Sequence, residues 1–266
     1  MLEIKQDLIP TELSVLRIED LVNPQPNIDL DAHLGREVAS GKRVPLVRVW
    51  RSAKPFGIGV SRKDVASEDG AKARQTLLNQ GISVIVRQTG GTAVPQGDGV
   101  IHLSLLFPRS AVRTTTDDYY RLLCDPLIAW FQSYGLEAYT GPLPGSYCDG
   151  SYNVLVDGKK LIGTAQAWRG GLAGMTSSHP GYILAHACIT VDVDWPLATL
   201  WMNRFYELAG DAYRVDESTS VSLRSLTPDR WEGLNRADAA EQSAEELQKY
   251  LIRYYLDKGV KLTVGS

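Results

Sequence analysis

The feature that most constrains the fold is the pair Asp157-Gly158, which stands between two short runs of alternating apolar residues, 152–156 and 160–165. Asp-Gly in this setting is the strongest short-range signal for a β-hairpin. We therefore expect two antiparallel strands in the middle of the chain. The second strand begins at Lys160, and the small residues that follow would let a ligand lie against its backbone.

A turn-rich loop with a single cysteine, Cys148, precedes this hairpin. The hairpin would bring Lys160 close to Cys148, where an ammonium group favours the nucleophilic thiolate and can donate a hydrogen bond to an oxyanion. A lone loop cysteine and a lysine at a hairpin tip also occur without any function. They define a candidate site only if a second element supplies a pocket.

The second element is the segment that begins at Arg87 and continues into the turn 89–92, Thr-Gly-Gly-Thr. Adjacent glycines let backbone N–H groups approach a carboxylate or phosphate, and an arginine adds a charged partner. The segment lacks the Gly-Lys-Ser/Thr ending of a phosphate-binding P-loop. Taken alone, it is more typical of a plain β-turn.

Periodicity predicts an alternation of strands and helices. Pro24 and Pro26 mark loops, and Pro126 predicts a kink or a restart within its helix. Ser243 with Glu246 resembles a capping box that opens the final helix. Helices are expected over 29–40, 66–79, 116–134, 194–210 and 243–259, and strands over 44–50, 56–60, 82–86, 100–107 and 182–193.

Three other chemically active side chains fit structural positions better than catalytic ones. Cys124 falls in an apolar helix, and His186 and Cys188 share one face of an apolar strand, so we expect them to be packed or hydrogen-bonded. His179 lies in a loop rich in Gly and Ser, 170–181. The helix over 194–210 carries an apolar stripe formed by Leu197, Leu200, Trp201, Phe205 and Leu208.

Composition excludes several classes of protein. The chain has 266 residues, which suits one large domain. Its net charge of −3 does not indicate binding to nucleic acid or to an anionic membrane. No apolar run is long enough to span a bilayer, and the N-terminus does not resemble a signal peptide, which predicts a cytoplasmic protein. Three cysteines without metal-ligand spacing predict neither a disulfide framework nor a metal site.

Two stretches resemble one family. RQTGGTAV at 87–94 is similar to the Arg-x-x-Gly-Gly-x-Ala-Val motif of the lipoate–protein ligase and octanoyltransferase catalytic domain, which is related to biotin–protein ligases. DGKKLIGTAQ at 157–166 is similar to that family's Gly-Lys/Arg-Lys-x-x-Gly-Ser/Thr-Ala-Gln motif. The resemblance covers about residues 40–225 and is closest to a branch that moves acyl groups through a cysteine thioester, because Ser-Tyr-Cys-x-Gly stands at 146–150 and no histidine follows Ala93-Val94.

Three residues depart from the pattern of that branch. Asp149 stands where proline is favoured, Asn153 where aspartate is usual, and His102 where asparagine is expected. These departures would alter the choice of acyl chain or of partner protein, or would mark a divergent subgroup with another substrate.

The resemblance implies an α+β fold, with a mixed and mostly antiparallel sheet and flanking helices. It implies one catalytic domain over 1–266 without a separate C-terminal accessory domain, and an acyl slot to which Ile85 and Leu161 contribute. Cys148, which we expect to be accessible, would be the nucleophile and Lys160 would contact the acyl carbonyl; no metal is implied. The substrate-binding residues implied are Arg87, Thr89, Gly90, Gly91, Thr92, Ala93, Val94, Gly163, Thr164, Ala165 and Gln166.

Three functions remain open at this point. The leading one is a transferase without cofactor, in which acyl carrier protein or the glycine-cleavage H-protein loads Cys148 and a lysine on the lipoyl domain of a 2-oxoacid dehydrogenase E2 subunit accepts the group. The second is an ATP- and Mg-dependent lipoate–protein ligase that uses an acyl-adenylate. The third is a binding protein for acylated carriers without chemistry. The sequence does not separate octanoyl from lipoyl groups and does not give the oligomeric state.

Overall fold

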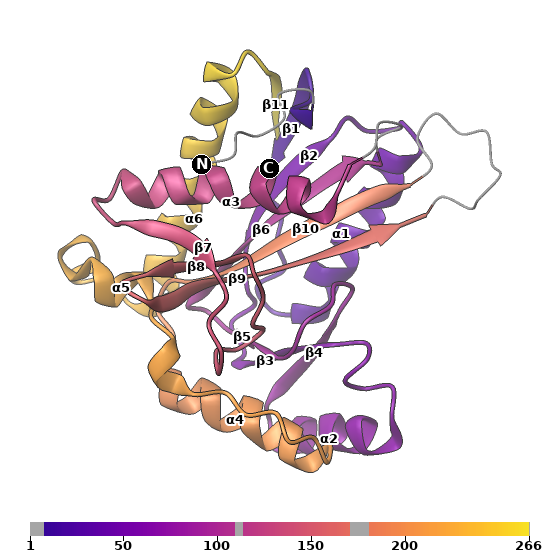
Figure 1. Ribbon diagram of the computed structural model, residues 1–266, viewed down its shortest axis with the longest axis vertical. Helices are drawn as coiled ribbons and strands as arrows, with labels where there is room; N and C mark the ends of the chain where they lie inside the picture. Colours follow the sequence, from indigo (N-terminus) through magenta and orange to yellow (C-terminus); the bar gives the residue numbers. More distant parts are fainter. Residues whose placement is uncertain (1–7, 110–113, 171–180, 266) are drawn as a thin grey trace.

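The computed structural model describes residues 8–109, 114–170 and 181–265. Its main element is an eight-stranded sheet with the order β11-β1-β2-β6-β10-β9-β8-β7, and a second sheet has the order β4-β3-β5 (Figure 1). The strands of the large sheet are β1 Glu12–Leu16, β2 Leu46–Arg51, β6 Val100–Pro108, β7 Ala138–Gly141, β8 Asn153–Val156, β9 Lys159–Arg169, β10 Tyr182–Thr190 and β11 Lys261–Gly265. Those of the small sheet are β3 Gly57–Ser61, β4 Ser83–Arg87 and β5 Val94–Gln96.

The predicted fold class is confirmed. The pairs from β2 to β7 along the large sheet are antiparallel, whereas β1 pairs in parallel with both β2 and β11. The helices flank the sheets: α1 Pro24–Ala39, α2 Glu68–Asn79, α3 Thr116–Gln132, α4 Trp195–Leu208, α5 Leu223–Leu226 and α6 Arg236–Asp257. Short 3₁₀ turns lie at Glu217–Thr219 and Pro228–Trp231.

The predicted hairpin is confirmed as β8 and β9. Asp157 and Gly158 both have positive φ, at 50° and 72°, which is the conformation that a two-residue type I′ turn requires. The second strand runs further than expected, to Arg169. The hairpin therefore sets the register of the strand that carries Lys160.

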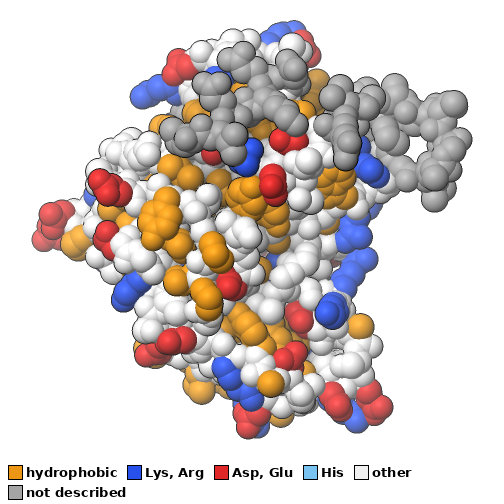
Figure 2. Space-filling view, in the orientation of Figure 1, with side chains coloured by type: hydrophobic (Ala, Val, Ile, Leu, Met, Phe, Trp, Pro, Cys, Tyr) orange, Lys and Arg blue, Asp and Glu red, His pale blue; other side chains and the backbone are white. Residues whose placement is uncertain are grey.

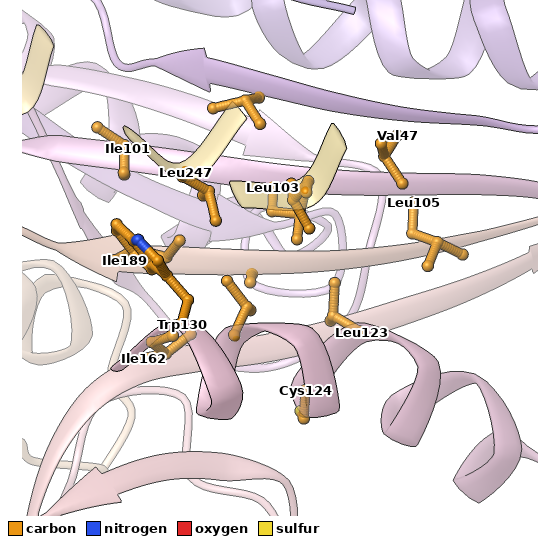
Figure 3. Packing of buried hydrophobic residues seen from close by; sticks show 14 of the residues in the cluster. Val47, Ile101, Leu103, Leu105, Leu123, Cys124, Trp130, Ile162, Ile189 and Leu247 are labelled. Carbon is orange, nitrogen blue, oxygen red and sulfur yellow. The ribbon is translucent and has the colours of Figure 1, made fainter. Parts of the chain in front are cut away.

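The main apolar core lies between one face of the large sheet and helices α3 and α6 (Figure 3). Alternation sends the odd-numbered residues of β6 and β10, such as Leu103 and Ile189, into this core. Cys124 is buried here, as predicted. A second core, between the small sheet, α2 and α4, includes Cys148 and Cys188.

Several boundaries differ from the predictions. Helix α1 begins at Pro24 rather than residue 29, because prolines in the first turn replace N–H groups that lack helical partners anyway. Helix α6 begins at Arg236 and is capped by Asn235, so the proposed capping box at Ser243 is wrong: Ser243 is a buried interior residue. Helix α3 continues through Pro126 without a restart.

The apolar stripe predicted for α4 is displaced around the helix. Leu197 and Leu200 are exposed, whereas Phe205 is buried as expected. Met202 and Tyr206, which the stripe omitted, are buried in the second core. The predicted loop residue His179 lies outside the described residues. Among the described residues, no helix is long and apolar enough to cross a membrane.

Candidate active site

The residues 144–150, here called the thiol loop, connect β7 to β8 and carry Cys148. The Cys148 backbone has a φ of 45°, a left-handed conformation that is strained for a residue other than glycine. The prediction of an accessible thiol is wrong, because Cys148 is only 4% exposed. Loop packing against the second core, which local sequence does not reveal, covers it.

Lys160 reaches from β9 under the thiol loop. Its Nζ donates hydrogen bonds to the backbone carbonyls of Tyr147 and Cys148, the latter at 2.8 Å, and lies 4.2 Å from the centre of the Tyr147 ring. Burial lowers the pKa of Lys160 to about 8. The ammonium therefore contacts the loop carbonyls, and an ammonium has one further N–H to offer. The neighbouring Lys159 is exposed.

The Gly-Gly turn is folded around the side chain of Arg87 at the end of β4. The guanidinium donates to the Thr89 hydroxyl at 3.2 Å, to the Gly90 carbonyl at 3.0 Å and to the Thr92 carbonyl at 2.6 Å. Its Nε is buried and has no hydrogen-bond partner among the described residues.

The turn and the thiol loop meet at the cysteine. A Cβ placed on Gly91, which has a φ of 91°, would lie less than 3.0 Å from the Cys148 sulfur and 3.6 Å from a terminal nitrogen of Arg87. The Cys148 N–H donates to the Thr92 hydroxyl at 2.9 Å. The structure thus brings together the two segments that the sequence singled out.

The small residues of β9 divide between its two faces. Gly163 and Ala165 pair with Cys188 and His186 and share their face, and a Cβ on Gly163 would lie 3.0 Å from the Tyr147 ring. Thr164 instead donates to the Tyr152 carbonyl.

The other residues proposed to line the slot also separate. Gln166 donates to the Thr116 carbonyl at α3, on the face opposite the thiol. Leu161 packs in the main core, so it does not line a slot beside Cys148. Ala93 and Val94 pack in the second core with Tyr147 and Cys148. Ile85 packs with Ile28 and Trp50.

Two buried histidines form a polar cluster beside this face. His186 and His102 share a hydrogen bond of 3.0 Å, and Ser52 links His102 at 2.9 Å to Gln96 at 2.6 Å. Burial lowers the pKa of His186 to about 3 and that of His102 well below its usual value, so both rings are neutral at pH 7. The ring of Trp50 stacks on His102. The prediction that His186 is hydrogen-bonded is confirmed.

Two of the residues that depart from the pattern of the branch contact each other. The Asn153 side chain donates to the Asp149 carboxylate at 2.8 Å, and the Leu143 N–H donates to the same oxygen. Asp149 and Asn153 therefore hold the exposed end of the thiol loop.

The other cysteine on this side, Cys188, is buried, and burial raises its pKa to about 12.

One face of the molecule mixes apolar and charged side chains. Hydrophobic side chains gather in the middle of the face in Figure 2, and Lys and Arg side chains lie along its right-hand edge. A groove of about 530 Å³ lies between α3, β7 and Tyr152, but neither Cys148 nor Lys160 lines it. The described residues hold no group of three or more His, Cys, Asp or Glu that could bind a metal ion.

Sequence reasoning missed two tyrosines at the site. The Ala93 N–H donates to the Tyr206 hydroxyl at 2.6 Å, and the Tyr213 hydroxyl donates to the Ser146 carbonyl at 2.6 Å. Tyr206 lies on α4 and Tyr213 follows it. Neither belongs to a motif, and only the spacing of Tyr206 four residues after Met202, on the same face of the helix, could have indicated a buried ring.

Comparison with known proteins places these features in context. A family model described as the lipoyl protein ligase A/B catalytic domain matches residues 23–253. An octanoyl-[GcvH]:protein N-octanoyltransferase from Kyrpidia tusciae is 39% identical over 204 residues, which cover 75% of this chain and 68% of the relative. One from Geobacillus kaustophilus is 28% identical over 228 residues, covering 85% and 75%.

Solved structures show the same fold. A lipoate-protein ligase A bound with ATP has a TM-score of 0.67 at 19% identity, covering 95% of this chain and 89% of that chain. A bipartite lipoate protein ligase from Thermoplasma acidophilum has a TM-score of 0.62 at 17% identity, covering 96% and 88%. At these identities the likeness supports the fold alone.

Proposed function

The chain belongs to the lipoyl protein ligase A/B catalytic-domain family, and on this premise we propose that it is an acyltransferase that moves an octanoyl or lipoyl group between proteins through a thioester on Cys148. The observation that carries the proposal is the contact between the thiol and the Gly91 turn. The names of the relatives point to octanoylated H-protein as donor. We propose the lipoyl domain of an E2 subunit as acceptor and acyl carrier protein as a second donor.

In the loading step, the Cys148 sulfur attacks the carbonyl carbon of the carrier-bound acyl group. A C–S bond forms, the bond from the acyl carbon to the carrier breaks, and the thiol proton leaves with the carrier's sulfur or nitrogen. Negative charge develops on the acyl oxygen, so donors aimed at that oxygen accelerate the step. The unpaired Nε of Arg87 and the third N–H of Lys160 are the donors that we propose for this role.

In the transfer step, a lysine amine of the acceptor attacks the thioester carbon. The C–N bond of the amide forms, the C–S bond breaks, and one proton of the amine returns to the Cys148 sulfur. Atoms balance without nucleotide or metal, so we propose that no cofactor is needed. The cysteines among the described residues are free, which fits a reducing compartment, and we propose the cytoplasm.

Of the predicted site residues, we retain Cys148 and Lys160 for chemistry and the turn 87–92 with Ala93 and Val94 for acyl binding. Gly163 and Ala165 face the thiol side, and we propose that the acyl chain passes over them. Thr164 and Gln166 contact the opposite face. Their proposed role is to fix β9 rather than to touch substrate.

The experiment that tests this function is transfer in the absence of nucleotide. Purified enzyme, octanoylated H-protein and an unmodified lipoyl domain are mixed without ATP, and the mass of the lipoyl domain is followed. We expect it to gain one octanoyl group. Modification only with free octanoate, ATP and Mg²⁺ would identify a ligase, and tight carrier binding without any modification would identify a binding protein.

A further inference from the structure

The thiol loop is held by a second element besides Lys160. The carbonyl of Gly145 accepts a hydrogen bond from the Asp216 N–H at 2.8 Å, and the carbonyl of Ser146 accepts one from the Tyr213 hydroxyl at 2.6 Å. Both donors come from the segment 211–216, which follows α4. With the two carbonyls held by Lys160, four consecutive carbonyls of the loop are bonded from outside it.

A second tyrosine, on α4, links this segment to Ala93, the residue that follows the Gly-Gly turn. Tyr206 is buried on α4, and its hydroxyl accepts the N–H of Ala93 at 2.6 Å. The rings of Tyr206 and Tyr213 pack edge to face with centroids 5.1 Å apart. A continuous path of contacts therefore runs from Ala93 through the two rings to Ser146.

We propose that Tyr206 and Tyr213 form a clasp that positions the Cys148 thiol against the acyl-binding turn. Both hydroxyls form hydrogen bonds with backbone groups of the two segments, so both tyrosines are positioning residues. The strained backbone at Cys148 supports this role, because a left-handed residue other than glycine persists only where the surroundings over-determine it. The inference rests on the proposed function for its consequence in turnover, but the positioning itself concerns the free enzyme.

The first test is kinetic. Tyr213→Phe removes only the hydroxyl that donates to Ser146 and leaves the ring on Tyr206. Because a misplacement of about 1 Å can reduce a rate by about a hundredfold, we expect partial loosening to lower kcat for loading of Cys148 by about tenfold, with KM for the carrier unchanged. Tyr206→Phe should lower kcat in the same way by freeing the turn.

The second test needs no acyl substrate. Alkylation of Cys148 by iodoacetamide, followed by peptide mapping, reports how well the loop covers a thiol that is 4% exposed. We expect alkylation to become several-fold faster in Tyr213→Phe, and to remain unchanged in the control Tyr250→Phe, whose ring lies on α6 against Tyr254. The melting temperature should remain within a few degrees of wild type, since the ring and its packing against Tyr206 are kept.

These outcomes separate the two proposals. Slower loading together with faster alkylation supports the clasp. Unchanged kcat and unchanged alkylation in folded Tyr213→Phe and Tyr206→Phe would overturn it, as would an increase in KM alone. If wild type shows no transfer but alkylation still responds to Tyr213→Phe, the clasp stands and the transferase proposal fails. If Tyr213→Phe does not fold, the result for Tyr206→Phe decides.

Discussion

Replacement of Gly91 by alanine should slow acylation by about a hundredfold without unfolding the protein. A Cβ at this position would lie less than 3.0 Å from the Cys148 sulfur, whereas carbon atoms in non-bonded contact keep about 3.5–4.0 Å. The sulfur must therefore retreat by about 1 Å or more. A displacement of this size can cost about a hundredfold in rate, or about 2.7 kcal/mol in activation free energy.

Stability should change less than activity. Alanine at a φ of 91° is strained, by about 1–3 kcal/mol, and the turn is exposed at Gly90 and Gly91, so the surrounding backbone can relax. We expect the melting temperature to fall by a few degrees for each kcal/mol lost. The loss of activity would then be much larger than any loss of folded protein.

The assay is single-turnover loading, followed by intact mass, at donor concentrations well above saturation. Gly90→Ala is the matched control, because Gly90 lacks a positive φ and a Cβ there would meet nothing within 4 Å. We expect Gly90→Ala to load at close to the wild-type rate. If Gly91→Ala is folded and loads as fast as Gly90→Ala and wild type, the thiol does not react from its position against the Gly91 turn.

Three further predictions concern β9. Lys160→Ala should reduce the rate of loading by at least about a hundredfold, because it removes the hydrogen bonds to the Tyr147 and Cys148 carbonyls. Lys159→Ala should have little effect, because Lys159 is exposed. Equal losses of loading rate in the two variants would instead indicate a docking patch. The pKa of Lys160 is about 8 in the folded protein, against an ordinary value of 10.5, so between these pH values the unfolded chain binds more protons than the folded one. The free energy of unfolding of wild type should therefore rise as the pH increases from 8 to 10.5. Relative to Lys160→Met, which has no such group, the rise should be about 3 kcal/mol at most. Urea titrations at pH 7 and 10 measure this difference, and an equal or opposite change would contradict it. Gly163→Val should slow loading, because its side chain would press on the Tyr147 ring, while Thr164→Val, on the opposite face, should load normally in the same assay.

Local patterns in the sequence predicted much of the fold. Asp157 and Gly158 both adopt the positive φ that a two-residue turn requires, so the β8–β9 hairpin and the position of Lys160 in it were predictable. Strand β1 was missed because it pairs with β2 and with β11, at the other end of the chain, and a five-residue strand stabilised by such distant partners leaves no local signal.

The candidate site was predictable as a set of segments but not as a geometry. The Gly-Gly turn and the thiol loop carry motifs, whereas the burial of Cys148 depends on hydrogen bonds from Tyr213 and Asp216, which belong to no motif. Alternation separates Thr164 and Gln166 from Gly163 and Ala165 and could have been anticipated, whereas the β-bulge that puts Lys160 on the same face as Gly163 could not. Thr164 and Gln166 were nevertheless grouped with Gly163 and Ala165, because the family resemblance gives a continuous stretch.

The most direct measurement of the central claim is the mass of the enzyme after incubation with octanoylated H-protein. We predict a gain of one octanoyl group that hydroxylamine removes and that maps to Cys148, since Cys148 lies against the Gly91 turn, whereas burial raises the pKa of the Cys124 and Cys188 thiols. Cys148→Ser should bind the carrier and lose nearly all turnover, because a serine hydroxyl is a much weaker nucleophile than a cysteine thiolate. Full transfer activity in folded Cys148→Ala would contradict the account.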